Sequence, residues 1–409
     1  MLDYYGVVMV WIHVGIDLLW LALDVAWLIV IMHWTRKTSW RVLAGVFIAV
    51  LMAAVLNEMI GRLGMERVNL SNIPKPIITV IVVWHFFGLA TFMGLGVVAV
   101  CQRMAHRLRR KPVAQNPSAV ASPAPNPVSR RQFINACATF APPLLTFGLT
   151  GIALGQLDRF RLRRFTLSLP SLPKQLDGLT IAHVSDIHVG EWTHGPILQE
   201  IVNAVNALRT DLVVMTGDLI NYELSDLSEA IALVKKMQGR YGQWIVEGNH
   251  DMLEDGLEFE RRVKAAGVPL LLDESDLATV RGYPVQVFGL RWMDGVGGYR
   301  DRVTSLQMRA LMEKRHPDAF PIFLAHHPHA FDAAIDADLP LTLTGHTHGG
   351  QLMLGKDVGV GPAFFRYWSG HYQRKNSQLI VSNGVGNMFP IRINAPAEIA
   401  HITLRSGVA

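Results

Sequence analysis

Five short clusters of Asp, Asn, His and Gly follow one another in the second half of this 409-residue chain. Carboxylate oxygens and neutral imidazole nitrogens together bind borderline divalent ions such as Mn, Fe, Zn or Ni. Two such ions about 3.5–4 Å apart can hold a phosphoryl group and activate a water molecule. Glycine beside the ligands lets the backbone turn sharply and leaves room for ions. The clusters are Asp186-Ile187-His188, Gly217-Asp218, Gly248-Asn249-His250-Asp251, His326-His327-Pro328 and Gly345-His346-Thr347-His348-Gly349-Gly350.

The same residue types are common in ordinary turns, so a single cluster would carry little weight. Here, however, each cluster follows a segment that predicts a β-strand, and the ends of strands are where open α/β sheets build their sites. Helices are expected at 196–209 and 225–238, between the early strands. The pattern predicts an α/β layer architecture. The expected strands are LTIAHVSD, DLVVMTGD and QWIVEGNHD, followed by 285–290, 320–325, 340–344, 378–382 and 398–404.

The order D-x-H, G-D, G-N-H-[DE], H and G-H-x-H resembles the signature of the calcineurin-like metallophosphoesterases, over roughly residues 178–405. The resemblance implies an α/β fold, a four-layer α/β/β/α sandwich. It also implies two divalent metal ions and hydrolysis of phosphoric esters by a metal-activated hydroxide, without a covalent enzyme intermediate. The identity of the ions stays open among Mn, Fe, Zn and Ni.

The resemblance also assigns roles to individual residues. His250 is expected beside the scissile phosphate, where it stabilises charge or protonates the leaving group, and Asp251 is expected to orient His250. His326 and His327 compete for one ligand position because neighbours on a strand point to opposite faces, and the family pattern H-x-P selects His326. The implied ligands are Asp186, His188, Asp218 and His348 for one ion, and Asp218, Asn249, His326 and His346 for the other, with Asp218 as the bridge.

The N-terminal part is apolar. Half of the residues in the chain are hydrophobic and only 17% are charged, and several apolar runs approach or exceed the ~20 residues that span a bilayer as a helix. The runs cover 5–34, 41–60, 77–101 and, more weakly, 136–157 with Pro142 and Pro143. We therefore expect a transmembrane helical region of three spans at 1–101, a basic Pro-rich linker at 102–134, a fourth span or signal-like segment at 135–158, and the metallophosphoesterase domain at 171–405.

Charge is divided unevenly along the chain, with a net +11 in residues 1–170 and −6 in residues 171–409. Basic residues beside apolar spans indicate membrane topology, and the acidic half lacks the interleaved basic and aromatic patch of a nucleic-acid site. We expect a membrane and a phosphorylated substrate as partners, and no nucleic acid. Cys101 and Cys137 are the two cysteines, and they do not determine the compartment.

The basic loops predict an orientation. The loops after the first and third runs are the more basic, so they are expected inside, and a fourth span would carry the catalytic domain to the outer face of a bacterial-type cell membrane. The sequence SRRQFI at 129–134 resembles a twin-arginine export signal. A chance arginine pair in an Arg-rich linker is the alternative, and the basic segment 158–165 favours a cytoplasmic domain if the fourth run does not cross.

The C-terminal segments GHTHGGQ and SNGVGNMFPIRINAPAEIAHITL resemble a membrane-associated branch of the family. That branch includes twin-arginine-exported phosphodiesterases and a UDP-2,3-diacylglucosamine pyrophosphatase of lipid A synthesis. The resemblance favours a phosphodiester or pyrophosphate substrate that is lipid-linked or belongs to the cell envelope. Arg392 either touches an anionic substrate or is a surface or packing arginine.

Three ionisable residues lie on one face of the first apolar run, namely His13, Asp17 and Asp24. Charged groups in a span are costly and often functional, so one alternative is a membrane sensor or transporter with a regulatory phosphoesterase-like domain. The other interpretation is hydrogen bonding between helices or a position near the membrane interface. A catalytically inactive binding module is a further possibility, against which the complete ligand set argues.

Overall fold

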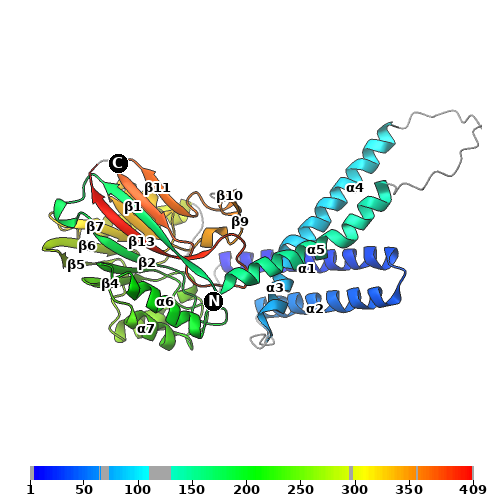
Figure 1. Ribbon diagram of the computed structural model, residues 1–409, viewed down its shortest axis with the longest axis horizontal. Helices are drawn as coiled ribbons and strands as arrows, with labels where there is room; N and C mark the ends of the chain where they lie inside the picture. The colour runs from blue at the N-terminus through cyan, green and yellow to red at the C-terminus, as the bar shows by residue number, and fades with distance from the viewer. Residues whose placement is uncertain are drawn as a thin grey trace, which may run out of the picture. The chain divides into compact units, whose positions relative to one another are not determined.

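The computed structural model describes residues 4–63, 65, 73–109, 130–293, 298–355 and 358–407. The chain divides into two compact units, Met1–Ile152 and Ala153–Ala409. The described part of the first unit is helical, whereas the second combines helices with β-sheets (Figure 1).

The helices of the N-terminal part are apolar along most of their length. Four segments are long and apolar enough to cross a membrane by length and composition: Val10–Trp34, Thr38–Gly61, Lys75–Ala105 and Gln132–Leu157. They lie in α1 (Tyr4–Trp34), α2 (Thr38–Arg62), the continuous run of α3 (Lys75–Val83), the π-helical η1 (Trp84–Gly88) and α4 (Leu89–Arg109), and α5 (Arg130–Leu157).

The weakest predicted span forms part of one helix, α5, which continues through Pro142 and Pro143. Prolines remove backbone donors from a helix, and hydroxyl side chains help to satisfy the freed carbonyls. The prolines free the carbonyls of residues 138 and 139, and the Thr146 hydroxyl donates to a different one, the carbonyl of Pro142, at 2.9 Å. Helical structure also enters both ends of the predicted linker, of which residues 110–129 lie outside the described part of the chain.

Asp24 is fully buried inside the N-terminal unit. Its Oδ1 accepts a hydrogen bond from Trp84 Nε1 at 2.7 Å, and its Oδ2 lies 3.3 Å from His85 Nε2. Trp84 and His85 are consecutive, and both belong to η1. Asp24 of the first span therefore forms hydrogen bonds between helices, which is the second of the two interpretations given for this polar face.

Two mixed sheets form the centre of the second unit. The first sheet has the order β1-β13-β2-β3-β4, in which β2, β3 and β4 are parallel and β13 is antiparallel to β2 (Figure 1). Its strands are β1 (Phe160–Leu169), β13 (Ala397–Ser406), β2 (Thr180–Val184), β3 (Leu212–Thr216) and β4 (Gly242–Val246).

The second sheet has the order β11-β12-β8-β7-β6-β5, with four parallel inner strands and an antiparallel strand at each edge. Its strands are β11 (Gly370–Arg374), β12 (Ser377–Val381), β8 (Leu341–Thr344), β7 (Phe320–Leu324), β6 (Tyr283–Gly289) and β5 (Glu274–Val280). A short separate hairpin pairs β9 (Met353–Gly355) with β10 (Val358–Gly359).

Three apolar cores hold the layers together. The inner core joins side chains of both sheets, including Ile181, Val214 and Ile322. A second core packs helices on the outer face of the first sheet, and a third packs helices on the outer face of the second sheet. The expected α/β fold with mixed sheets is confirmed. The helices are α6 (Pro196–Ala207), α7 (Leu227–Lys236) and α8 (Gly256–Ala265) on one side, and α9 (Gly298–Met312) and α10 (Ala330–Asp336) on the other.

Candidate metal centre

The order of the strands brings the predicted ligands to one edge of the two sheets. Parallel strands present their carboxyl ends together, so loops that follow different strands meet there. Asp186 and His188 follow β2, Asp218 follows β3, and Asn249 follows β4. From the second sheet, His326 follows β7, and His346 and His348 follow β8.

Five of these residues adopt a left-handed backbone conformation. Their φ angles are positive, at 51° for Asp186, 49° for His188, 52° for Asp218, 72° for His346 and 49° for His348. Side-chain-bearing residues reach this region only at an energetic cost, and such strain gathers at functional sites where the surrounding structure enforces it. Hydrogen bonds between the loops provide that enforcement, since the amide of Asp186 donates to Gly217 O at 3.0 Å and that of His188 to Asp218 O at 3.0 Å.

One group of donor atoms gathers around the Nε2 atoms of His188 and His348, which lie 3.0 Å apart. Asp186 Oδ1 lies 3.4 Å from His348 Nε2, and Asp218 Oδ2 lies 3.5 Å from His188 Nε2. All four side chains are buried. We call these residues the first ligand cluster.

A second group gathers around Asn249 Oδ1. It lies 2.9 Å from His346 Nδ1 and 3.2 Å from His326 Nε2. Asp218 Oδ2, which already belongs to the first cluster, lies 3.2 Å from His326 Nε2. We call Asp218, Asn249, His326 and His346 the second ligand cluster, and Asp218 joins the two.

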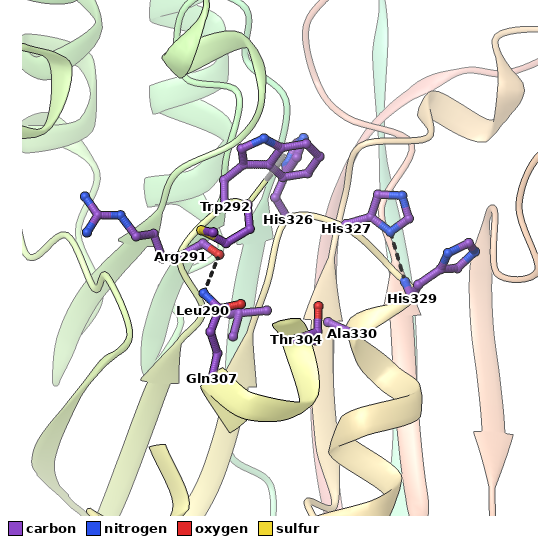
Figure 2. Close-up of a pocket in the computed structure, with 10 residues that line it drawn as sticks. Leu290, Arg291, Trp292, Thr304, Gln307, His326, His327, His329 and Ala330 are labelled. Carbon is purple, nitrogen blue, oxygen red and sulfur yellow. Dashed lines mark hydrogen bonds between the residues drawn. The ribbon is translucent and has the colours of Figure 1, made fainter. Parts of the chain in front are cut away.

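The structure separates His326 from its neighbour His327. His326 Nδ1 lies 2.6 Å from the carbonyl of Thr216, so Nδ1 carries a proton and Nε2 faces the cluster. Metal-binding histidines usually donate their second N–H to a carbonyl in this way. His327 points elsewhere, and its Nδ1 accepts from the amide of His329 at 3.2 Å (Figure 2).

The spacing of the donor atoms fits metal ligation. Ligands held about 2.0–2.2 Å from one ion, at angles of roughly 90–109°, lie about 2.8–3.6 Å from one another. The distances within both clusters fall between 2.9 and 3.5 Å. Burial raises the pKa of Asp186 to about 7, and the negative charge of Asp218 adds to the effect. A divalent cation would offset this desolvated negative charge.

His250 lies beside the first ligand cluster on η3 (His250–Met252). Its amide donates to Asp218 Oδ1 at 2.8 Å, and its ring centroid lies 4.6 Å from that of His188. Its Nδ1 lies 2.6 Å from the carbonyl of Asn221. Because a carbonyl only accepts, Nδ1 carries the proton and Nε2 is the atom left for substrate chemistry.

Asp251, which is expected to orient His250, makes its own hydrogen bonds to the backbone of two loops. The buried Asp251 carboxylate accepts from three backbone amides: Leu219 N at 2.8 Å, Ile220 N at 3.1 Å and Gly248 N at 2.9 Å. The carbonyl of Asn221 holds the His250 ring instead. Asp251 therefore ties the loop after Asp218 to the loop that carries Asn249, which positions ligands on both.

Sequence analysis left two interpretations of Arg392, and the structure shows it packed inside the fold, fully buried. Its Nε donates to Asn387 Oδ1 at 2.8 Å, and its Nη1 donates to the carbonyls of Asn383 at 2.9 Å and Ala395 at 3.1 Å. Its Nη2 lies 3.1 Å from His348 Nδ1. Burial lowers the pKa of Arg392 to about 10, so it remains charged at neutral pH.

Trp292 and Asn221 are site residues that the sequence analysis missed. The Trp292 ring centroid lies 5.5 Å from those of His326 and His346. Trp292 follows β6 outside any of the five motifs, and Asn221 contributes only its backbone carbonyl, which is common to every residue type. Neither position therefore has a distinguishing pattern in the sequence.

Similarity to known proteins covers the same part of the chain. Residues 179–350 match the family model of calcineurin-like phosphoesterases. The uncharacterized metallophosphoesterase YkuE of Bacillus subtilis is 28% identical over 68% of this chain and 98% of its own length. A transmembrane protein with metallophosphoesterase domain from Danio rerio is 30% identical over 58% of this chain, and its counterpart from Bos taurus is 28% identical over 58%.

The matched regions make up 56% and 55% of those two vertebrate proteins, so the chain spans little more than half of their length. Among solved structures, an archaeal phosphodiesterase aligns over 51% of this chain and 85% of its own, with 12% identity and a TM-score of 0.28. The family match lies in the unit that carries both ligand clusters. This chain therefore contains a metal-dependent phosphoester hydrolase domain of the calcineurin-like metallophosphoesterase family, preceded by apolar helices.

Proposed function

We propose that this chain is a membrane-anchored hydrolase of phosphodiesters or pyrophosphates that uses two divalent ions. The observation that carries the proposal is the pair of ligand clusters that share Asp218 Oδ2. Asp186, His188, Asp218 and His348 would hold one ion. Asp218, Asn249, His326 and His346 would hold the other. When bound, two such ions neutralise phosphoryl oxygens and lower the pKa of a coordinated water.

The residues of the chain itself orient the substrate and move the proton. The carbonyl of Asn221 keeps the His250 ring in one orientation through Nδ1. In its protonated form His250 can therefore transfer a proton from Nε2 to the leaving oxygen, as a general acid does. The backbone amide of His250 also donates a hydrogen bond to Asp218. This bond fixes the position of His250 relative to the carboxylate that both clusters share.

Membrane attachment and an outward-facing catalytic domain are also part of the proposal. They are supported by the four apolar helical segments and by the basic residues at the start of α5, where the twin-arginine-like sequence lies. A substrate that is lipid-linked or belongs to the cell envelope fits an enzyme held at a bilayer. Pyrophosphate hydrolysis of a UDP-2,3-diacylglucosamine type is one case of this class.

The side of the membrane can be tested with a single cysteine. Cys101 and Cys137 would be replaced by serine, and Glu313→Cys would introduce a thiol at an exposed position of the catalytic unit. Labelling of intact spheroplasts by a membrane-impermeant maleimide is expected. Labelling only after lysis would place the domain inside and contradict the proposed orientation.

The test of the catalytic proposal is hydrolysis of bis(p-nitrophenyl) phosphate by the purified full-length chain, with Mn²⁺ and after chelation. Turnover is expected to depend on the metal and to be lost in Asp218→Asn, because this change weakens the ligand that both clusters share. Asp318→Asn, at an exposed position, is the matched control and should retain activity. Absence of turnover with each of Mn²⁺, Fe²⁺, Zn²⁺ and Ni²⁺ would refute the proposal.

A further inference from the structure

The second ligand cluster is bordered by aromatic side chains that do not belong to it. The ring centroid of His346 lies 5.5 Å from that of Trp292 and 5.6 Å from that of Phe365. His327 lies between them, at 4.7 Å from His346, 6.1 Å from Trp292 and 6.0 Å from Phe365. We call Trp292, His327 and Phe365 the aromatic wall.

The backbone of Trp292 is held by a buried residue, and the surface next to Trp292 is exposed to solvent. The amide of Trp292 donates to the buried carboxylate of Glu247 at 3.1 Å, which fixes the base of the indole. A cavity of about 30 Å³ lies beside Trp292, His326 and His327 (Figure 2). Met293 also lines this cavity and is 39% exposed, so apolar surface continues from the wall toward solvent.

The opposite end of the site differs in chemistry. His250 stands beside His188 of the first cluster, with its ring held by the carbonyl of Asn221. One end can therefore supply a proton, whereas the other offers apolar and aromatic surface. A phosphodiester has two substituents on phosphorus, and only one of them leaves. The substituent that leaves needs the proton of His250, so the aromatic wall is available for the one that stays.

We propose that the aromatic wall is a subsite for a hydrocarbon chain on the substituent that remains bonded to phosphorus. The inference rests on the proposed function and assigns a lipid phosphodiester as its substrate class. In the reaction, the oxygen of water forms the new P–O bond, the P–O bond to the leaving group breaks, and the leaving oxygen takes a proton from His250. The proton that the water loses passes to solvent, from which His250 is protonated again. The product that keeps the hydrocarbon chain is then a phosphate monoester.

A hydrocarbon chain suits this surface better than a polar group does. Trp292 and Phe365 present rings without charge, and Arg291, which lines the cavity, pairs with Glu260. Apolar surface removed from water stabilises binding in proportion to its area. The same chain carries four apolar helices of membrane-spanning length, which would keep it among lipids.

The test uses methyl, butyl, octyl and phenyl p-nitrophenyl phosphates, which share one leaving group and differ only in the retained substituent. The full-length protein would be assayed in nanodiscs with Mn²⁺, with substrates kept below their aggregation limits. Each fully buried methylene favours binding by up to about fourfold. We expect kcat/KM to rise at least tenfold from methyl to octyl, and we expect this ratio to fall to about three or less in Trp292→Ala and Phe365→Ala.

Leu277→Ala is the matched control, because Leu277 is exposed on the edge strand β5 and should leave the ratio unchanged. Metal content would be measured for each variant to show that both ions remain bound. The subsite would be overturned by an octyl-to-methyl ratio of kcat/KM near one in the wild type, or by an unchanged ratio in both Trp292→Ala and Phe365→Ala. In either case, turnover of the methyl ester would still support the proposed function. Preference for a phenyl over an octyl substituent would overturn the hydrocarbon assignment. Absence of metal-dependent turnover of all esters would overturn the proposed function itself.

Discussion

Replacing Arg392 by methionine would remove a buried cation that links the C-terminal loop to His348. The guanidinium of Arg392 contacts Asn387 Oδ1 at 2.8 Å, and Asn383 O at 2.9 Å. It also lies 3.1 Å from the Nδ1 atom of His348. Methionine has a similar length and no donors, so it fills much of the space and removes only the polar contacts. We expect the His348 ring to lose its fixed orientation toward the first ligand cluster.

The size of the effect follows from the role of groups that support metal ligands. Loss of such a partner typically lowers metal affinity about 10–100-fold, which corresponds to about 1.4–2.8 kcal/mol. The second cluster takes its remaining ligands from Asn249, His326 and His346, whereas the Arg392 guanidinium contacts His348 of the first cluster. The loss should therefore be confined to one of two metal equivalents.

Calorimetric titration of the metal-free, full-length protein with Mn²⁺ would measure this change without reference to turnover. Arg281→Met is the matched control, since Arg281 donates to the carbonyls of Asp177 at 2.8 Å and Gly178 at 3.1 Å and pairs with Asp211, outside both clusters. If Arg392→Met bound both Mn²⁺ equivalents with wild-type affinity, the supporting role of Arg392 would be refuted. Equal weakening of both equivalents would refute its confinement to the first cluster.

Three further predictions follow from individual contacts. His250→Ala should lower the turnover rate by about 10²–10⁴-fold, the range for a general acid, while the metal content measured by mass spectrometry stays unchanged; a normal rate would exclude the assigned role. Asp251→Ala should lower the free energy of unfolding by about 3 kcal/mol or more, because three buried amides lose their acceptor at about 1 kcal/mol or more each, and denaturant unfolding monitored by tryptophan fluorescence would measure this loss. Burial lowers the pKa of His183 from 6.5 to about 3, so below pH 6.5 the unfolded state binds a proton that the native state does not. Stability should therefore fall by about 2 kcal/mol between pH 6.5 and pH 5, and this part of the pH dependence should be absent in His183→Gln.

Local patterns in the sequence were sufficient for the elements that carry the site. Apolar β-rich segments ending in Asp186 and Asp218 predicted β2 and β3, and the structure has both strands buried at those positions. The parallel order of strands then brings their ends together, which explains why five separated motifs could be recognised as one centre. Long apolar runs likewise predicted the four helical segments, because the length of an apolar helix is visible without any knowledge of its neighbours.

Other strands depend on partners that lie far away in the chain. β1 pairs in parallel with β13 along ten residue pairs, from Phe160 with Ala397 to Leu169 with Ser406. The sequence of β1, FRLRRFTLSL, is rich in arginine and was not predicted as a strand. Arg161 and Arg163 of that strand pair with the buried Glu398 of β13, so its basic residues are compensated only once the sheet forms.

The residues available for metal chemistry and their order can be read from the amino-acid sequence. The strands, helices and apolar spans that carry them can be read there too, because propensity and hydrophobic periodicity act over a few neighbouring residues. The contacts that these residues make become visible in the folded structure. It turned His326 and not His327 into the second cluster, gave Asp251 to three backbone amides, and placed Arg392 against His348. Such contacts join residues from separate loops, and their geometry depends on strand register and packing, which no local pattern encodes.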